Sequence, residues 1–172
     1  SDASANIAMQ KARLYTKQGK FKEALITLYP YCTNPDAYPP VYSDYLVILI
    51  WAGQAQEAIR RFEKLPAAFP RRVYLLRNMA KACLDQGDPV KARALYGEVL
   101  AQHPDDLTAW EGMTAAQVRI YADQGKYDEA LTALSPYRND PAKYPAFYSD
   151  YLVILIWAGQ AQEAIRRFEK LP

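Results

Sequence analysis

Histidine and cysteine are scarce in this sequence. Among 172 residues there is one histidine, His103, and there are two cysteines, Cys32 and Cys83. A zinc site or a disulfide framework needs several of these side chains at characteristic spacings, and a nucleophilic site needs a base beside its nucleophile. The chain also has no glycine-rich phosphate loop and no HExxH or CxxC motif. We therefore expect no metal, no cofactor and no enzymatic activity.

Long apolar runs and an excess of charge are also missing. The longest apolar run has eight residues, at 45–52 and again at 151–158, whereas a membrane span needs roughly 20. Lys and Arg number 21 and Asp and Glu number 19, for a net charge of +2, which gives no basic surface for nucleic acid. We expect neither membrane insertion nor nucleic-acid binding. No secretory signal is visible in the opening SDASANIAMQ, which leaves the compartment open between cytoplasm and periplasm.

What the sequence does contain is an internal duplication. Residues 42–66 and 148–172 share the same 25 letters, YSDYLVILIWAGQAQEAIRRFEKLP, without a mismatch. A glycine motif recurs more often, with spacings of 34, 34, 38 and 34 residues, at Gly19, Gly53, Gly87, Gly125 and Gly159. A fixed internal period is the signature of a stacked repeat protein. We expect a single array over 1–172 and a supra-repeat of 106 residues, with units at about 5–38, 39–72, 73–106, 107–144 and 145–172.

Each unit has the pattern of a helix, a tight turn and a second helix. The recurring glycine marks the turn, because glycine enters the left-handed backbone region at little cost. An alanine follows five residues after each glycine, where a small side chain lets the two helices approach closely. The one spacing of 38 adds about one helical turn at ~3.6 residues per turn. It predicts a longer helix that begins near Asp106.

These features together resemble the tetratricopeptide repeat (TPR). The second unit matches the family pattern at Tyr42, Tyr45, Leu46, Leu49, Gly53, Ala58, Phe62 and Pro70. The third unit matches it at Leu76, Met79, Ala80, Gly87, Ala92, Tyr96 and Pro104. The resemblance covers nearly the whole chain and implies an all-α fold, a right-handed superhelical solenoid of antiparallel helix pairs with about five units, the last truncated. It also implies a non-catalytic scaffold for protein–protein interactions.

In the TPR family the first helix of each unit lines a concave groove. Carried over to this chain, the resemblance places eight candidate binding residues there: Arg13, Lys17, Trp51, Tyr74, Arg77, Lys81, Arg119 and Trp157. Ser43 and Val47 are expected to face the same groove. The cations suggest a protein or peptide partner with an acidic stretch, oriented by Arg77 and Lys81, which share one helix face. The aromatic rings would bury its apolar side chains.

Two alternatives stay open. Tyrosines cluster at Tyr38, Tyr42 and Tyr45 and again 106 residues later, which suits either helix packing or a stacking surface for a sugar chain. The WAGQ motif at 51–54 resembles the TPR portion of bacterial exopolysaccharide-export proteins of the outer membrane, which would imply a polysaccharide partner, a bacterial origin and a periplasmic location. The verbatim copy suggests instead an engineered or excised self-assembling scaffold.

The fifth unit raises a separate expectation. Its sequence is that of the second unit, which is internal to the array, and an interior unit buries both of its faces. We therefore expect its outer face to expose apolar side chains, namely Leu152, Ile156, Ile165 and Phe168. Such a face favours end-to-end or swapped self-association.

Overall fold

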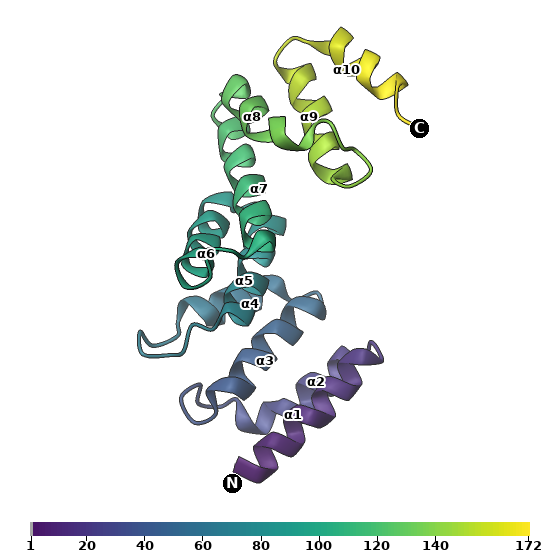
Figure 1. The fold of residues 1–172 in the computed structure, drawn as a ribbon. Coiled ribbons are helices and arrows are strands. Elements are labelled where there is room, and N and C mark those ends of the chain that lie inside the picture. Colours follow the sequence, from purple (N-terminus) through teal and green to yellow (C-terminus); the bar gives the residue numbers. More distant parts are fainter. Residues whose placement is uncertain (1) are drawn as a thin grey trace.

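Ten α-helices and two short 3₁₀ helices, with no strand, make up residues 2–172, the part of the chain that the computed structural model describes. They are α1 (Asp2–Lys17), α2 (Phe21–Leu28), η1 (Tyr29–Tyr31), α3 (Pro39–Trp51), α4 (Ala55–Glu63), α5 (Val73–Asp85), α6 (Pro89–Gln102), α7 (Leu107–Asp123), α8 (Tyr127–Leu134), η2 (Ser135–Tyr137), α9 (Pro145–Trp157) and α10 (Ala161–Glu169). Figure 1 shows them stacked in chain order into an elongated array with the termini at opposite ends. The expected all-α solenoid of TPR-like helix pairs is confirmed.

A glycine makes the turn within each helix pair. Gly53, between α3 and α4, has a φ of +82°, and its copy Gly159 has the same value. This left-handed region costs other L-residues free energy. Apart from Gly53 itself and its two chain neighbours, no described residue has an atom within 4 Å of a Cβ built on Gly53, so the backbone angle and not a lack of space selects glycine. The amide of Gln54 then donates to the carbonyl of Leu49 at 2.8 Å and closes the turn.

Small residues and caps set the helix spacing and the helix starts. The alanine that follows each turn glycine is buried in all five units, at Ala24, Ala58, Ala92, Ala130 and Ala164. The four extra residues lengthen α7 to 17 residues, against 13 in α3, as the spacing predicts. Asp106 caps the start of α7, because its side chain accepts a hydrogen bond from the amide of Ala109 at 3.0 Å.

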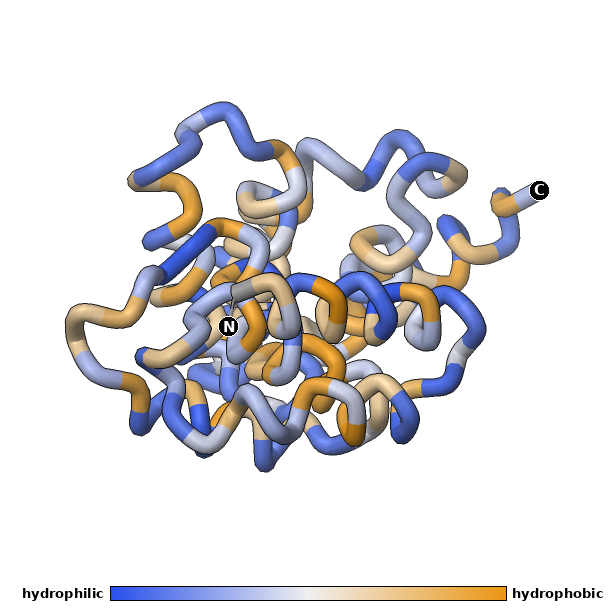
Figure 2. Tube along the Cα trace, turned by 90° about the horizontal axis from the view of Figure 1, so that it is seen from below, coloured by the Kyte–Doolittle hydropathy of each residue, from blue (hydrophilic) through white to orange (hydrophobic). Residues whose placement is uncertain are grey.

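The buried apolar side chains form two clusters that meet within α7. The larger cluster runs from Ala5 to Ala116 and the smaller one from Val118 to Ala164. Apolar and polar segments alternate along the helices, and the end marked C projects from the body of the array (Figure 2). The last pair, α9 and α10, contacts the array chiefly through α8. In the described part of the chain, no helix is both long enough and apolar enough to cross a lipid bilayer.

Candidate functional site

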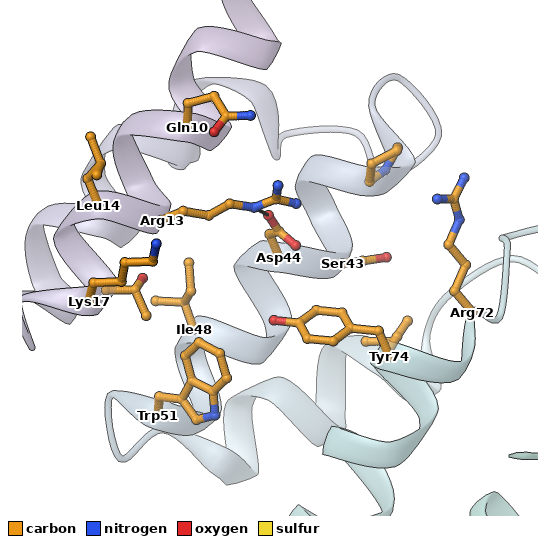
Figure 3. Close-up of a pocket in the computed structure, with 13 residues that line it drawn as sticks. Gln10, Arg13, Leu14, Lys17, Ser43, Asp44, Ile48, Trp51, Arg72 and Tyr74 are labelled. Carbon is orange, nitrogen blue, oxygen red and sulfur yellow. Dashed lines mark hydrogen bonds and ion pairs between the residues drawn. The ribbon is translucent and has the colours of Figure 1, made fainter. Parts of the chain in front are cut away.

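A cavity of about 760 Å³ opens between the first three units. Its walls come from α1, α3 and the start of α5 (Figure 3). Four of the eight candidate residues line it: Arg13, Lys17, Trp51 and Tyr74. The volume falls in the range of about 300–1,000 Å³ that ligand sites usually occupy. The fold therefore brings half of the expected groove residues to one place.

An ion pair joins the first two walls of this cavity. Nε of Arg13 on α1 donates a hydrogen bond to Oδ2 of Asp44 on α3 at 3.1 Å (Figure 3). The Asp44 side chain is 10% exposed, while that of Arg13 is 53% exposed. Burial raises the pKa of Asp44 by more than the neighbouring guanidinium of Arg13 lowers it. The pair ties α1 to α3 and holds a largely buried acid at the cavity.

Two aromatic rings line the same cavity. Trp51 is the last residue of α3 and is 43% exposed, and Tyr74, in the first turn of α5, is 45% exposed. Figure 3 shows both rings below Asp44 in that view. Burial and the nearby Asp44 charge raise the pKa of Tyr74, so its hydroxyl stays protonated at neutral pH. Exposed ring faces of this kind bury apolar side chains or stack on sugar rings.

Two cations lie on opposite sides of the cavity in Figure 3. Lys17 ends α1 and Arg72 immediately precedes α5, and both are exposed. Among the ion pairs found within the described residues, none engages Lys17 or Arg72. These two side chains are therefore free to bind a carboxylate of a ligand.

Arg77 and Lys81, the residues expected to orient an acidic partner, do not line this cavity. Nε of Arg77 lies 3.5 Å from Oδ2 of Asp106. Lys81 forms an ion pair with Asp85, one helical turn further along α5. Their charges are thus partly neutralised within the array, and their part in binding stays a prediction.

Arg119 and Trp157 lie nearer the C-terminal end of the array, away from this cavity. Arg119 of α7 interacts electrostatically with Asp150 of α9. Trp157 ends α9, is 56% exposed, and has its ring centroid 6.3 Å from that of Tyr127. The eight candidate residues therefore do not form one continuous site.

The sequence does not single out Asp44 or Arg72, although both line the cavity. A signal for Asp44 exists, since an acid in the apolar stretch YSDYLVILIW needs a partner when it is buried. Val47, expected to face the groove, is fully buried, and that expectation is wrong. The reason is that α3 packs against both α1 and α5, which enclose it. Ser43 does line the cavity, as expected.

The two cysteines do not have the surroundings of a nucleophile. Cys32 and Cys83 are free and buried. Burial raises the pKa of Cys32 to about 12 and that of Cys83 to about 11, which disfavours the reactive thiolate. Nor does the described part of the chain hold a cluster of three or more His, Cys, Asp or Glu side chains placed to bind a metal ion.

The sequence profile of the tetratricopeptide repeat matches residues 49–116 and 84–149, which together cover more than half of the chain. The chain belongs to the tetratricopeptide repeat family. Proteins of this family are generally non-catalytic scaffolds for protein interactions. No curated protein matches the chain in sequence.

Solved structures of other TPR proteins share the fold. MamA from Desulfovibrio magneticus RS-1, from residue 41 to its end, superposes with a TM-score of 0.74 at 17% identity, covering 97% of this chain and 92% of that one. Another MamA structure gives 0.72 at 14% identity, with 99% and 91% covered. A tetratricopeptide repeat protein from Parabacteroides merdae ATCC 43184 gives 0.62 at 16% identity, with 98% and 78% covered. Identities this low show the fold alone, and the resemblance to exopolysaccharide-export proteins stays a hypothesis.

Proposed function

We propose that this TPR array is an interaction scaffold whose first three units bind an extended peptide in the cavity around Asp44. One observation carries the proposal. Lys17 and Arg72 are exposed cations on opposite sides of the cavity, and the half-exposed rings of Trp51 and Tyr74 lie in the same lining. A pair of unpaired cations beside apolar ring faces favours a ligand of mixed chemistry.

The ligand that fits this lining carries an acidic side chain next to an apolar one. Lys17 and Arg72, on opposite sides of the cavity, would each donate charge-assisted hydrogen bonds to a carboxylate of the ligand. Aromatic side chains bury an apolar group at low entropic cost, because they have few rotatable bonds. Arg77 and Lys81 would be weaker anchors, since each already forms an ion pair with a carboxylate of the array.

A peptide display screen against the purified protein tests this function. We expect the selected peptides to place Asp or Glu beside Leu, Ile or Phe. The double substitution Lys17→Glu/Arg72→Glu should weaken the best peptide by about tenfold or more in a calorimetric titration, because it replaces two attractive charges with repulsive ones. Binding to the unsubstituted protein should also weaken as salt is added.

The matched control is Lys22→Glu/Lys126→Glu. It changes the net charge by the same amount, and both lysines are exposed and lie outside the cavity lining. We expect this control to keep most of the affinity. Equal losses in the two double variants, or no loss in the cavity variant, would contradict binding at this cavity.

A polysaccharide is the second candidate ligand. The lining of the cavity includes the rings of Trp51 and Tyr74 and polar side chains such as Gln10 and Ser43, and sugar sites combine stacking with hydrogen bonds. Binding to a glycan array that Trp51→Ala abolishes, and that Lys17→Glu/Arg72→Glu leaves intact, would favour this alternative over the peptide.

A further inference from the structure

The two identical copies of the 25-residue segment differ in burial. Three pairs of apolar side chains show the difference in exposed fraction: 6% for Phe62 against 65% for Phe168, 8% for Ile59 against 56% for Ile165, and 0% for Val47 against 39% for Val153. Ile154 and Leu155 stay buried, as in the first copy. The difference is therefore confined to one face of α9 and α10, the face that continues the array. The exposure expected for Ile165 and Phe168 is present.

In the first copy, α5 and the segment 67–72 that precedes it cover this face. The ring of Phe69 meets that of Tyr42 edge-on, with centroids 6.1 Å apart. The guanidinium of Arg71 lies 4.7 Å from the ring centroid of Phe62. Helix α5 packs against both α3 and α4. The contacts in the first copy therefore show which groups can cover this face.

We propose that the outer face of α9 and α10 is a docking surface for a TPR helix pair of the type of residues 67–104. The occupant is defined by the groups that residues 67–104 present to the first copy: an aromatic ring, an arginine and a cluster of apolar side chains on α5. Because 42–66 and 148–172 are identical in sequence, a helix pair that fits one face fits the other. Within residues 2–172, nothing covers the second face.

A polar contact also constrains how residues 67–104 align on the first copy. Nζ of Lys91 on α6 lies 2.5 Å from an oxygen of Glu63 at the end of α4. Together with Phe69 and Arg71, Lys91 helps to set how residues 67–104 pack on α3 and α4. Two of the side chains that these residues meet are repeated as exposed side chains on the proposed surface, Phe168 and Glu169, whereas Tyr148, the copy of Tyr42, is already buried. A generic apolar helix would bury the face but would not reproduce these contacts.

The order of the units argues against a second intact copy as the occupant. Residues 107–144 correspond to residues 1–38 across the 106-residue supra-repeat, and the third unit lies between the second and the fourth. Two copies meeting end to end would place the fifth unit against a unit of the first type, with no unit of the third type between them. We therefore favour a helix pair over a second copy as the occupant, and the experiment below distinguishes the two.

Docking would also complete a second cavity like the one around Asp44. This inference rests on the function proposed for the Asp44 cavity. A shift of 106 residues takes Arg13, Asp44 and Trp51 to the same residue types, at Arg119, Asp150 and Trp157. The third unit supplies the Tyr74 wall of the first cavity, and the docked helix pair would supply that wall again. Asp123 stands where the first cavity has Lys17, so the second cavity would carry less positive charge than the first and would bind an acidic ligand less well.

The test joins a second copy of residues 67–104 to the chain after Pro172 and follows amide hydrogen exchange by mass spectrometry. We expect exchange in α9 and α10 to slow by about tenfold or more, because covering a terminal unit raises its local opening free energy. Exchange in α1 and α2 should not change. Unchanged exchange in α9 and α10 would overturn the proposal.

The control variant is Ile165→Asp/Phe168→Asp, made in both the original and the extended protein. Because both side chains are exposed, the original protein should keep its fold and its exchange pattern, whereas the extended protein should lose the added protection. Protection that survives the substitution would show docking elsewhere and overturn the proposal. Sedimentation of the original protein tests the other occupant: a dimer that Phe168→Asp abolishes would replace the helix pair with a second copy. Peptide binding at the Asp44 cavity is a separate readout and fails or succeeds independently.

Discussion

Asp44 and Glu57 carry the same kind of group in opposite surroundings. Burial raises the pKa of Asp44 above 3.8 despite the hydrogen bond from Arg13. Glu57 lies partly exposed on α4, and hydrogen bonds from Arg60 and Arg61 lower its pKa from 4.5 to about 2. The contribution of Asp44 to stability is therefore present below its unfolded pKa and is lost as the pH rises through its raised value. That of Glu57 is present above about 4.5 and is lost as the pH falls toward about 2.

A carboxyl ¹³C NMR titration checks both directions. We expect the midpoint of Asp44 above 3.8 and that of Glu57 near 2. Arg13→Ala should raise the Asp44 midpoint further and leave the Glu57 midpoint unchanged. Arg60→Ala/Arg61→Ala should raise the Glu57 midpoint and leave the Asp44 midpoint unchanged. Arg13→Ala should also cost about 1–3 kcal/mol of unfolding free energy, because it leaves a largely buried carboxylate without its donor. An Asp44 midpoint that ignores Arg13→Ala would contradict the ion pair.

At the scale of the helix pair, three glycines lie in three different surroundings. Gly53 has a positive φ in a turn with open space around it. Gly112 lies where α7 crosses α6, and a Cβ there would overlap the ring of Tyr96. Gly97, within α6, has room for a Cβ, which would lie 3.6 Å from Cε of Met113. The array therefore depends on glycine at two of these positions and not at the third.

Alanine substitution at each position distinguishes these surroundings. Gly53→Ala should cost about 1–2 kcal/mol of unfolding free energy through the backbone angle. Gly112→Ala should cost about 1–3 kcal/mol, because α6 and α7 must move apart. Gly97→Ala should stabilise the protein by about 0.5–1 kcal/mol, since alanine favours the helix interior. Urea unfolding measures all three, and a destabilising Gly97→Ala would contradict the packing of α6 on α7.

The helix pairs can be predicted from the sequence because their signals are local. The turn glycine, the alanine five residues later and the 34-residue spacing all lie within one unit and recur in phase. The candidate site is harder, because its contacts cross units. The pairing of Arg13 with Asp44 spans 31 residues, and the burial of Val47 depends on how closely α1 and α5 flank α3. The ion pair and the burial of Val47 both depend on how neighbouring units pack, which the sequence of one unit does not determine.

At the scale of the whole molecule, the array behaves as a row of units that touch only their neighbours. The stability of such a row is approximately a sum of unit terms and interface terms. The fifth unit has the sequence of the second but contacts the array on one side only, chiefly through α8. Identical residues should therefore contribute differently to stability according to the units that neighbour them.

The pair Phe62→Ala and Phe168→Ala tests this dependence on neighbours most directly, because the two phenylalanines stand at the same place in identical segments of 25 residues. Phe62 is 6% exposed and Phe168 is 65% exposed. In urea unfolding followed by circular dichroism, we expect Phe62→Ala to lower the unfolding free energy by about 3–5 kcal/mol and Phe168→Ala by less than about 1 kcal/mol. Equal losses from the two substitutions would contradict a stacked array in which the neighbouring unit, and not the local sequence, decides what each side chain contributes.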